Sequence, residues 1–275
     1  MSQLSVAQGK IATLRNLLEK SKGEIAKALP RHLTPERMAR VAITAVQKTP
    51  ELLDCDPVSI VGAVMQASQL GLDLDGILGQ AYLVPYKNRK ANRTDAQLIV
   101  GYKGFLALAR RSGQVSVFAA HIAYENDVFQ FTLGTKPEIV HKPHFGERGK
   151  PVAAYAVLIY GDGGADCEVI SWPEVLEFQQ RYAKRGRDGT LFGPWIDHLI
   201  EMAKKTAIRR IAKRAPLSVE LTRAAALDDL AENELPQDLG AELGLSRTDE
   251  VSARLAALAA EPEADPPAEA AGKEE

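Results

Sequence analysis

The stretch 81-AYLVPYKNRKANRTDAQLIV-100 decides the fold class of this chain. Its two ends, residues 81–86 and 96–100, are short apolar runs, and the segment between them is rich in Lys, Arg and Asn. Apolar runs of this length on either side of a polar segment are typical of two strands joined by a turn. We therefore expect a β-hairpin with a basic tip.

More strands are expected after the hairpin. A segment with helical spacing covers 102–112, and apolar runs of strand length follow at 115–124, 128–133, 138–141, 152–160 and 167–171. The last two runs are separated by Gly161-Asp162-Gly163-Gly164, which favours a tight turn. Consecutive strands flanked by helices predict an α+β fold with a largely antiparallel sheet, and disfavour a doubly wound nucleotide-binding fold.

Helices are expected before and after these strands. Thr34-Pro35 and Asp56-Pro57 are typical starts of helices, and Gly71 is a typical end. The predicted helices cover residues 6–20, 36–48, 58–70, 173–184 and 194–215. We divide the chain into a helical N-terminal arm (1–30), a core (31–227) and a tail rich in Ala, Glu, Asp and Pro (228–275). We expect short helices early in the tail and disorder beyond about residue 259.

Charge is distributed unevenly, although the formal net charge is only -2. Residues 1–219 hold 30 Lys and Arg against 21 Asp and Glu, whereas residues 220–275 hold 4 against 15. A basic body of this kind favours a polyanionic ligand. We expect the acidic tail to compete with that ligand, to recruit a partner, or only to keep the protein soluble.

The composition, with 45% hydrophobic and 25% charged residues, is ordinary for a soluble globular protein. Cys55 and Cys167 stand far apart, so they indicate neither a disulfide framework nor a structural zinc site. No apolar run approaches the length of about 18 residues that a membrane span needs, and no signal peptide is recognisable. We therefore expect a cytoplasmic location and no membrane partner.

The segment 194-PWIDHLIEMAKKTAIRRIAKRAP-216 concentrates the cations, because residues 204–214 hold six basic residues and no acid. Cations near the end of a helix offset its dipole by about 0.3–1 kcal/mol each, but six of them repel one another unless an anion is bound. We expect the apolar face to be buried and the basic face to be free for a polyanion. The apolar face holds Ala207, Ile208, Ile211, Ala212 and Ala215, and the basic face holds Lys205, Arg209, Arg210, Lys213 and Arg214. Lys204 falls in the apolar sector, where we expect it to reach a carboxylate or the rim.

Other cations gather at three places, which together with the basic face would be able to line one groove. Each group alone is typical of a solvated surface. The groups are Lys87, Arg89, Lys90 and Arg93 at the hairpin tip, Lys103, Arg110 and Arg111 on the next helix, and Arg181, Lys184, Arg185 and Arg187 in a loop.

The polyanion is most consistent with nucleic acid held by its backbone. Aromatic residues make up only 6% of the chain, and we expect those in strands, such as Tyr82 and Phe118, to lie in the core. A stacking platform or a base-reading helix is therefore not favoured. A grip on phosphates leaves bases free to pair, which suits strand annealing.

Enzymatic motifs are weak. The P-loop pattern GxxxxGK[ST] is absent, which excludes a P-loop NTPase at the level of motif. Asp73, Asp75 and the pair His141 and His144 leave a metal-dependent nuclease open, although an acidic turn and a surface pair of histidines also explain them. We expect no catalysis and no required cofactor, with Mg²⁺ entering only through DNA. A scaffold that merely coats DNA is a third reading.

Three ordered motifs closely resemble the RecT family of phage and prophage recombinases, over about residues 30–225. They are GL (71–72) with GQAYLVPY (79–86), QLIVGYKG (97–104) with LARRSG (108–113), and GPW (193–195) with His198 and EMAKKTAIRR (201–210). Leu74 departs from the family, whose members often have Pro there, so the turn at this point is not assigned from the resemblance.

The resemblance implies an α+β core with a positively charged DNA groove. It also implies that the protein binds single-stranded DNA, anneals it to its complement without ATP, and holds the annealed duplex. Assembly into rings or filaments and a phage exonuclease partner are implied as well. The family motif positions expected to contact phosphate are Lys103, Arg110, Arg111, Lys204, Lys205, Arg209 and Arg210. Lys213, Arg214, Lys87, Arg89, Lys184, Arg185 and Arg187 are candidates by charge and helical phase only.

Overall fold

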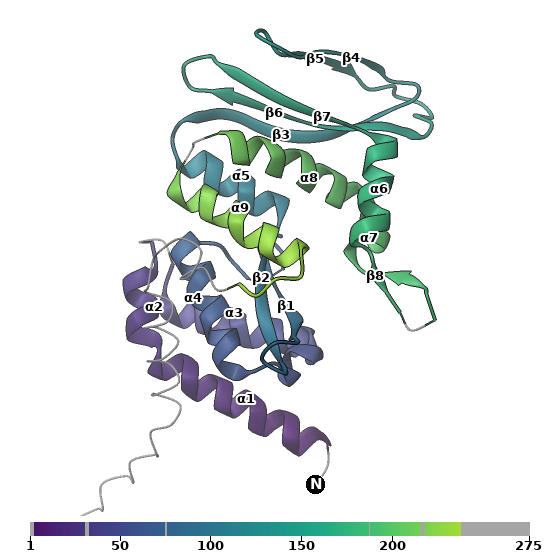
Figure 1. The fold of residues 1–275 in the computed structure, drawn as a ribbon. Helices are drawn as coiled ribbons and strands as arrows, with labels where there is room; N and C mark the ends of the chain where they lie inside the picture. Colours follow the sequence, from purple (N-terminus) through teal and green to yellow (C-terminus); the bar gives the residue numbers. More distant parts are fainter. Residues whose placement is uncertain (1–2, 31–32, 75, 187, 216–217, 238–275) are drawn as a thin grey trace, which may run out of the picture.

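A computed structural model describes residues 3–30, 33–74, 76–186, 188–215 and 218–237 of the chain. The described residues form an α+β fold with antiparallel sheets, as expected. Figure 1 shows N-terminal helices around a hairpin at one end and a three-stranded sheet at the other, with helices between them. None of the described helices is long and apolar enough to cross a membrane.

The N-terminal part is helical because its caps are encoded locally. Thr34 Oγ1 accepts a hydrogen bond from the backbone N–H of Arg37 at 3.3 Å, and an Asp56 carboxylate oxygen accepts one from Val58 at 3.1 Å. Gly71 ends the last helix with a left-handed φ of 62°. The elements are α1 (Gln3–Lys20), α2 (Lys22–Ala28), α3 (Pro35–Lys48), the 3₁₀ helix η1 (Pro50–Asp54) and α4 (Pro57–Leu70).

The predicted hairpin is present as β1 (Ala81–Asn88) and β2 (Arg93–Val100), paired from Ala81↔Val100 to Asn88↔Arg93. Helix α5 (Tyr102–Arg111) begins directly after it. A Cβ atom on Gly101 would lie 2.3 Å from the carbonyl oxygen of Gly79, and one on Gly104 would lie 2.2 Å from that of Gln80. These two glycines are therefore required for the close packing of α5 against the start of β1.

A second sheet has the strand order β3-β6-β7 and is antiparallel throughout. Its strands are β3 (Val115–Tyr124), β6 (Pro151–Tyr160) and β7 (Ala165–Ser171), and the hairpin of β4 (Val128–Thr132) and β5 (Glu138–Lys142) emerges between β3 and β6. Figure 1 shows α5 and α8 (Leu199–Arg214) on one side of this sheet and the β4–β5 hairpin on the other.

The remaining elements follow β7. They are α6 (Trp172–Tyr182), the short strands β8 (Lys184–Arg185) and β9 (Leu191–Phe192), α7 (Pro194–Asp197), α8, and α9 (Val219–Glu232). The predicted helix over 194–215 is thus interrupted, because His198 has φ -136° and ψ 43°. Helices α2 and α9, η1 and the β8–β9 pair lie outside the elements predicted from the sequence.

Helix α9 runs across residue 228, where the sequence suggested the start of the tail. Asp228 is 2% exposed and Leu230 6%, so residues 228–232 pack with the core. The segment after α9 covers the outer edge of β2, because Gln237 accepts a hydrogen bond from the N–H of Leu98 at 2.7 Å and donates one to its carbonyl at 2.6 Å. The disorder expected beyond about residue 259 concerns residues outside those described.

Candidate nucleic-acid interface

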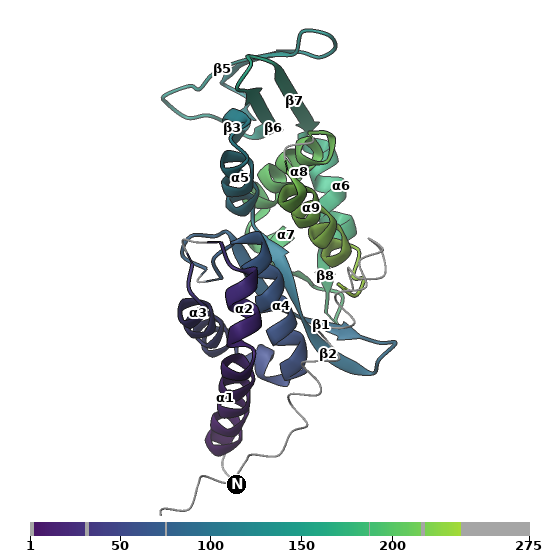
Figure 2. The ribbon, with the colours of Figure 1, turned by 90° about the vertical axis from the view of Figure 1, so that its left-hand side faces the viewer.

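The apolar face of α8 is buried, as the sequence predicts. Ala207, Ile208 and Ile211 are fully buried, and Ala212 is 2% exposed. Helix α8 packs against the β3-β6-β7 sheet and against α5 and α9 (Figures 1 and 2). Burial of this face therefore joins the sheet to the helices and fixes the direction of the basic face.

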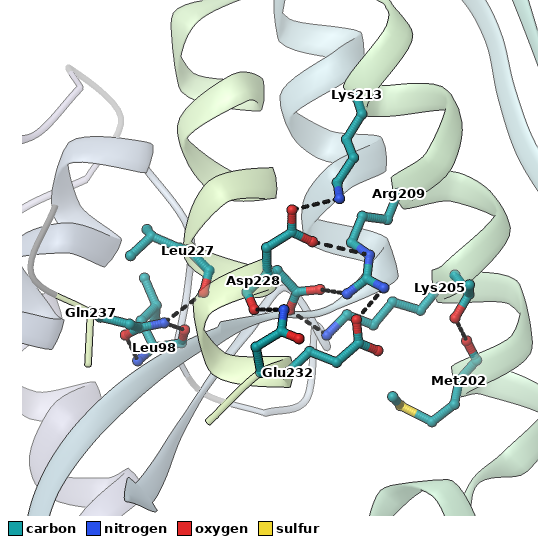
Figure 3. A network of polar contacts seen from close by, with 12 residues as sticks. Leu98, Met202, Lys205, Arg209, Lys213, Leu227, Asp228, Glu232 and Gln237 are labelled. Atoms are coloured by element: carbon teal, nitrogen blue, oxygen red, sulfur yellow. Dashed lines mark hydrogen bonds and ion pairs between the residues drawn. The ribbon is translucent and has the colours of Figure 1, made fainter. Parts of the chain in front are cut away.

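The expectation that the basic face of α8 is free is wrong. Figure 3 shows its cations directed at carboxylates of α9. The Lys205 ammonium lies 2.5 Å from one Asp228 oxygen, and Arg209 Nη1 lies 3.2 Å from the other. Arg209 also pairs with Glu232, and with Asp229 at 3.6 Å. The acids that compensate these cations lie on the next helix, not on an external ligand.

Burial makes this network part of the core. Lys205 and Arg209 are only 8% and 9% exposed as residues. Burial by itself lowers the pKa of Arg209, but the charges of Asp228 and Glu232 outweigh it and the net shift is upward. Burial also raises the pKa of Glu232, against the charge of Arg209. Lys205 and Arg209 are therefore held by the fold in buried ion pairs and are largely inaccessible to DNA phosphates.

The other cations of α8 are paired at its sides. Arg210 lies 3.0 Å from Glu168 and 2.6 Å from Glu174, and its guanidinium sits 5.2 Å from the centre of the Phe178 ring. Arg214 pairs with Glu168 at 2.6 Å and with Asp166 at 3.2 Å.

Lys213 and Lys204 complete the set of paired cations. Lys213 lies 2.5 Å from Asp229, and its side chain is about half exposed. Lys204 reaches Glu201 at 3.0 Å, which confirms the expected carboxylate partner. Glu201 thus pairs with Lys204 three residues later, and the neighbouring Lys205 pairs with Asp228 of α9.

Arg111 has a structural role in this fold. Its guanidinium donates to the carbonyl of Leu70 at 2.9 Å and to that of Gly71 at 3.1 Å, at the C-terminus of α4. Burial lowers its pKa. Unpaired carbonyls at the end of a helix attract cations, so Arg111 stabilises the junction of α4 and α5.

A second set of predicted cations remains exposed, and we call its members the outer cations. They are Lys87, Arg89, Lys103, Arg110, Lys184 and Arg185. Within the described residues, none of these six side chains has an ion pair or a hydrogen bond. Arg187, another predicted cation, lies outside the described residues.

The outer cations come from three elements. Lys103 and Arg110 are seven residues apart on α5, so they share one face of the helix. Lys87 and Arg89 lie at the tip of the β1–β2 hairpin, and Lys184 and Arg185 form β8. Figures 1 and 2 place the β1–β2 and β8–β9 hairpins at the same level along the molecule, on the side of α7 away from the β3-β6-β7 sheet.

Tyr82 differs from the expectation that strand aromatics lie in the core. It is 41% exposed, whereas Phe118 is 2% exposed. A Cβ atom on Gly79 would lie 3.1 Å from the Tyr82 hydroxyl and 3.4 Å from Cδ of Lys103. An exposed aromatic ring therefore stands beside an outer cation.

Two of the four residues considered for metal chemistry, Asp73 and His141, are held by other contacts. Asp73 is buried and lies 2.5 Å from the Arg37 guanidinium, and Asp75 lies outside the described residues. His141 Nε2 lies 3.0 Å from Asp127 and Nδ1 lies 2.8 Å from the Tyr155 hydroxyl. The buried His141 ring therefore connects Asp127 to Tyr155 and is not half of a surface pair. No group of three or more His, Cys, Asp or Glu suited to a metal ion occurs among the described residues.

Comparisons with known proteins agree with the sequence motifs. The model of the RecT family matches residues 36–239, which is more than half of the chain. The chain belongs to the RecT family. It is 43% identical to Protein RecT of Escherichia coli strain K12 over 210 residues, covering 76% of each chain. Membership in this family supports DNA binding, annealing and recombination as the general function.

A more distant relative is an uncharacterized protein, YqaK, of Bacillus subtilis strain 168. The identity is 29% over 178 residues, which cover 63% of this chain and 57% of the relative. The chain thus spans somewhat more than half the length of that relative.

The carboxylate partners of α8 were missed from the sequence, although a signal for them exists. Lys205, Arg209 and Lys213 are spaced by four residues, and so are Asp228 and Glu232 on the following helix. Two consecutive helices with opposite charges at the same spacing indicate pairing between the helices.

Proposed function

We propose that this protein anneals complementary strands of DNA without ATP, and that it holds single-stranded DNA by its phosphates with the outer cations. The division of the basic residues carries the proposal. Four cations of α8, namely Lys205, Arg209, Arg210 and Arg214, are neutralised by acids of the same chain, whereas the outer cations are exposed and unpaired within the described residues. Exposed cations are the groups that exchange counterions for phosphates.

This proposal moves the DNA contact away from the buried part of α8. Lys205 and Arg209 would have to leave Asp228 before they could reach a phosphate, and a buried charge left without its partner costs several kcal/mol. Arg210, Lys213 and Arg214 are less buried, and a phosphate would have to compete with their carboxylates. The surface around α5 and the two hairpins needs no such rearrangement.

Tyr82 adds a second kind of contact to the same surface. Its exposed ring lies beside Lys103, so one nucleotide would be able to place its base on the ring and its phosphate near the ammonium. Stacking on an aromatic ring is tolerant of sequence because every base has a π-face. The remaining contacts would be to phosphates, which leaves bases free to pair with a second strand.

The salt dependence of DNA binding tests whether the outer cations contact phosphates. The double variant Lys103→Ala with Arg110→Ala should weaken binding of all single-stranded sequences alike and reduce the slope of log affinity against log salt by about 0.7 for each lost phosphate contact. The matched control is Lys136→Ala with Lys142→Ala, which removes two exposed cations from the β4–β5 hairpin. Equal effects of the two double variants would argue against a specific DNA contact at Lys103 and Arg110.

An annealing assay separates the proposal from its rivals. With labelled complementary oligonucleotides, no nucleotide and either magnesium or manganese, we expect faster formation of duplex and no fragments. Fragments would support the metal-dependent nuclease. Binding without faster annealing would support a scaffold that only coats DNA.

Assembly and partners belong to the same proposal. The RecT resemblance supports homo-oligomeric rings or filaments and a phage exonuclease that exposes the strand. The cytoplasmic location and the independence from a cofactor stay predictions. Light scattering of the full chain, with and without two complementary oligonucleotides added in succession, would detect the assembly.

A further inference from the structure

A pocket of about 350 Å³ lies outside the surface proposed for the DNA backbone. Its walls come from β3, β5 and β6, from the segment between β5 and β6, and from the N-terminal half of α8. The polar and aromatic side chains in its lining are His121, Tyr124, His141, Arg148, Tyr155 and Lys204. It lies at β3, which is an edge strand of its sheet.

Among the described residues, one buried acid, Asp127, lies beside this pocket, and Arg148 compensates its charge. Asp127 has a fully buried side chain and accepts hydrogen bonds from Arg148 Nε at 3.0 Å and Nη2 at 2.6 Å. The backbone N–H groups of Tyr124 and His144 donate to it at 2.9 and 2.8 Å, and His141 lies at 3.0 Å. Asp127 therefore fixes the orientation of Arg148, and the two opposite charges of this pair offset each other in part.

Two of the aromatic residues are already engaged with each other and with Asp127. Nε2 of His141 lies 3.0 Å from an Asp127 oxygen, and Nδ1 lies 2.8 Å from the Tyr155 hydroxyl oxygen. Both ring nitrogens of His141 and the Tyr155 hydroxyl thus already have a hydrogen-bond partner. The ring of Tyr155 also packs at 5.6 Å between centres from that of His121.

Three other groups keep donors for a ligand. Arg148 Nη1 has no hydrogen bond to any described residue, and neither have the ring nitrogens of His121. The Lys204 ammonium has one bond, to Glu201, whose side chain is 46% exposed and which does not line the pocket. The donors come from three different elements, so a ligand in the pocket would meet them from several sides.

We propose that this pocket binds a phosphate group through Arg148, Lys204 and His121, and that it takes the terminal phosphate of a DNA strand. A compact anion with several acceptor oxygens matches donors on several sides, and charged donors make such bonds short and strong. The strand end as the source of the phosphate rests on the proposed function. Free phosphate shares the same chemistry and is separated from the strand end by the test below.

The environment of His121 links phosphate binding to its protonation. Burial, with His141 and Lys204 nearby, lowers its pKa. The charged and titratable groups that surround it are His141 on β5, Lys204 on α8, Tyr155 on β6, and Arg148 with its partner Asp127. A bound phosphate would favour the imidazolium, so binding should be accompanied by uptake of a proton.

The test compares oligonucleotides of one sequence with a 5′-phosphate, a 3′-phosphate or hydroxyl groups at both ends, bound to the full chain. We expect one phosphorylated end to bind about five- to tenfold more tightly, as charge-assisted hydrogen bonds would give. His121→Gln and Lys204→Gln should each abolish that preference and leave the binding of the hydroxyl-ended strand nearly unchanged. Lys103→Gln, the matched control, should weaken all three strands equally.

Inorganic phosphate provides an arm that needs no DNA. We expect millimolar phosphate to raise the melting temperature of the wild type and to shift the imidazole resonances of His121, and neither effect in Lys204→Gln. A phosphate effect without any preference for a strand end would support the pocket and assign it to free phosphate. No effect of phosphate and no end preference would overturn the proposal. If the wild type responds to inorganic phosphate but binds none of the three DNA strands, the result would count against the proposed function and not against the pocket.

Discussion

The carboxylate of Asp228 on α9 lies 2.5 Å from the ammonium of Lys205 on α8 and accepts a second contact from Arg209. The two helices are thereby joined through a charge cluster that is almost completely buried. A cluster of this kind is sensitive to the loss of one member, because the remaining charge is left buried without compensation. The basic appearance of α8 in the sequence therefore reflects the packing of α9 more than an open binding face.

Asp228→Asn should destabilise the protein by about 3–5 kcal/mol, because Lys205 would lose its carboxylate partner inside the core and Arg209 would lose one of its three. Urea unfolding followed by circular dichroism measures the change. The control is Lys213→Ala, which removes a half-exposed pair with Asp229 and should cost about 1 kcal/mol or less. Losses of similar size in the two variants would contradict a buried network.

The strands were predictable because their signals are local. Alternation and turn residues such as Gly161-Asp162-Gly163-Gly164 placed β6 and β7 within a few residues of their observed bounds. Whether a charged side chain is buried or paired does not depend on the local sequence alone. Lys205 meets an acid 23 residues away and Arg210 one 42 residues away, so burial and pairing depended on the tertiary packing.

The break at His198 shows the same limit within a helix. Pro194 starts a helix well, and no Gly or Pro interrupts residues 195–215, so the sequence predicted one continuous helix. The outer cations were all named from the sequence, but so were the buried ones. Only the fold separates Lys103, which is exposed, from Arg209, which is 9% exposed.

Gly104→Ala should destabilise the protein by about 1–3 kcal/mol, because the new Cβ atom would lie 2.2 Å from the carbonyl oxygen of Gln80 and force α5 away from β1. Thermal or urea unfolding measures it. Gly62→Ala is the matched control, since no atom other than its chain neighbours and the backbone of its own helix α4 lies within 4 Å of its Cβ position. That variant should gain about 0.5–1 kcal/mol from helix propensity. A stable Gly104→Ala protein would show that the close approach is not required.

Acid should weaken the region around the β4–β5 hairpin through Asp127. The hydrogen bonds from Arg148, followed by those from the His144 backbone and His141, hold the pKa of Asp127 well below its ordinary value of 3.8. Its contribution is therefore complete above the unfolded pKa and is lost as the pH falls from about 5 through the folded pKa. Urea unfolding of the wild type at pH 7, 5, 4 and 3 should show this loss.

Asp127→Asn is the variant that checks the assignment. It should be less stable than the wild type at pH 7, and its stability should change less between pH 5 and pH 3, because the depressed carboxyl group is gone. Parallel curves for the two proteins across this range would mean that other carboxyl groups cause the acid sensitivity.

The acidic segment after the described core offers a test of competition with DNA. Residues 238–275 hold 10 Asp and Glu against 3 Lys and Arg. Removal of residues 228–275 would also delete the partners of Arg209 and the Gln237 side chain that covers β2, so the informative cut follows residue 237. A chain that ends there should bind single-stranded DNA more tightly at low salt. The difference should shrink as the Debye length falls below about 8 Å above 0.15 M salt. A full-length variant with these acids changed to Asn and Gln should behave like the shortened chain if charge is responsible. If both bind as the wild type does at every salt concentration, the segment does not compete with DNA.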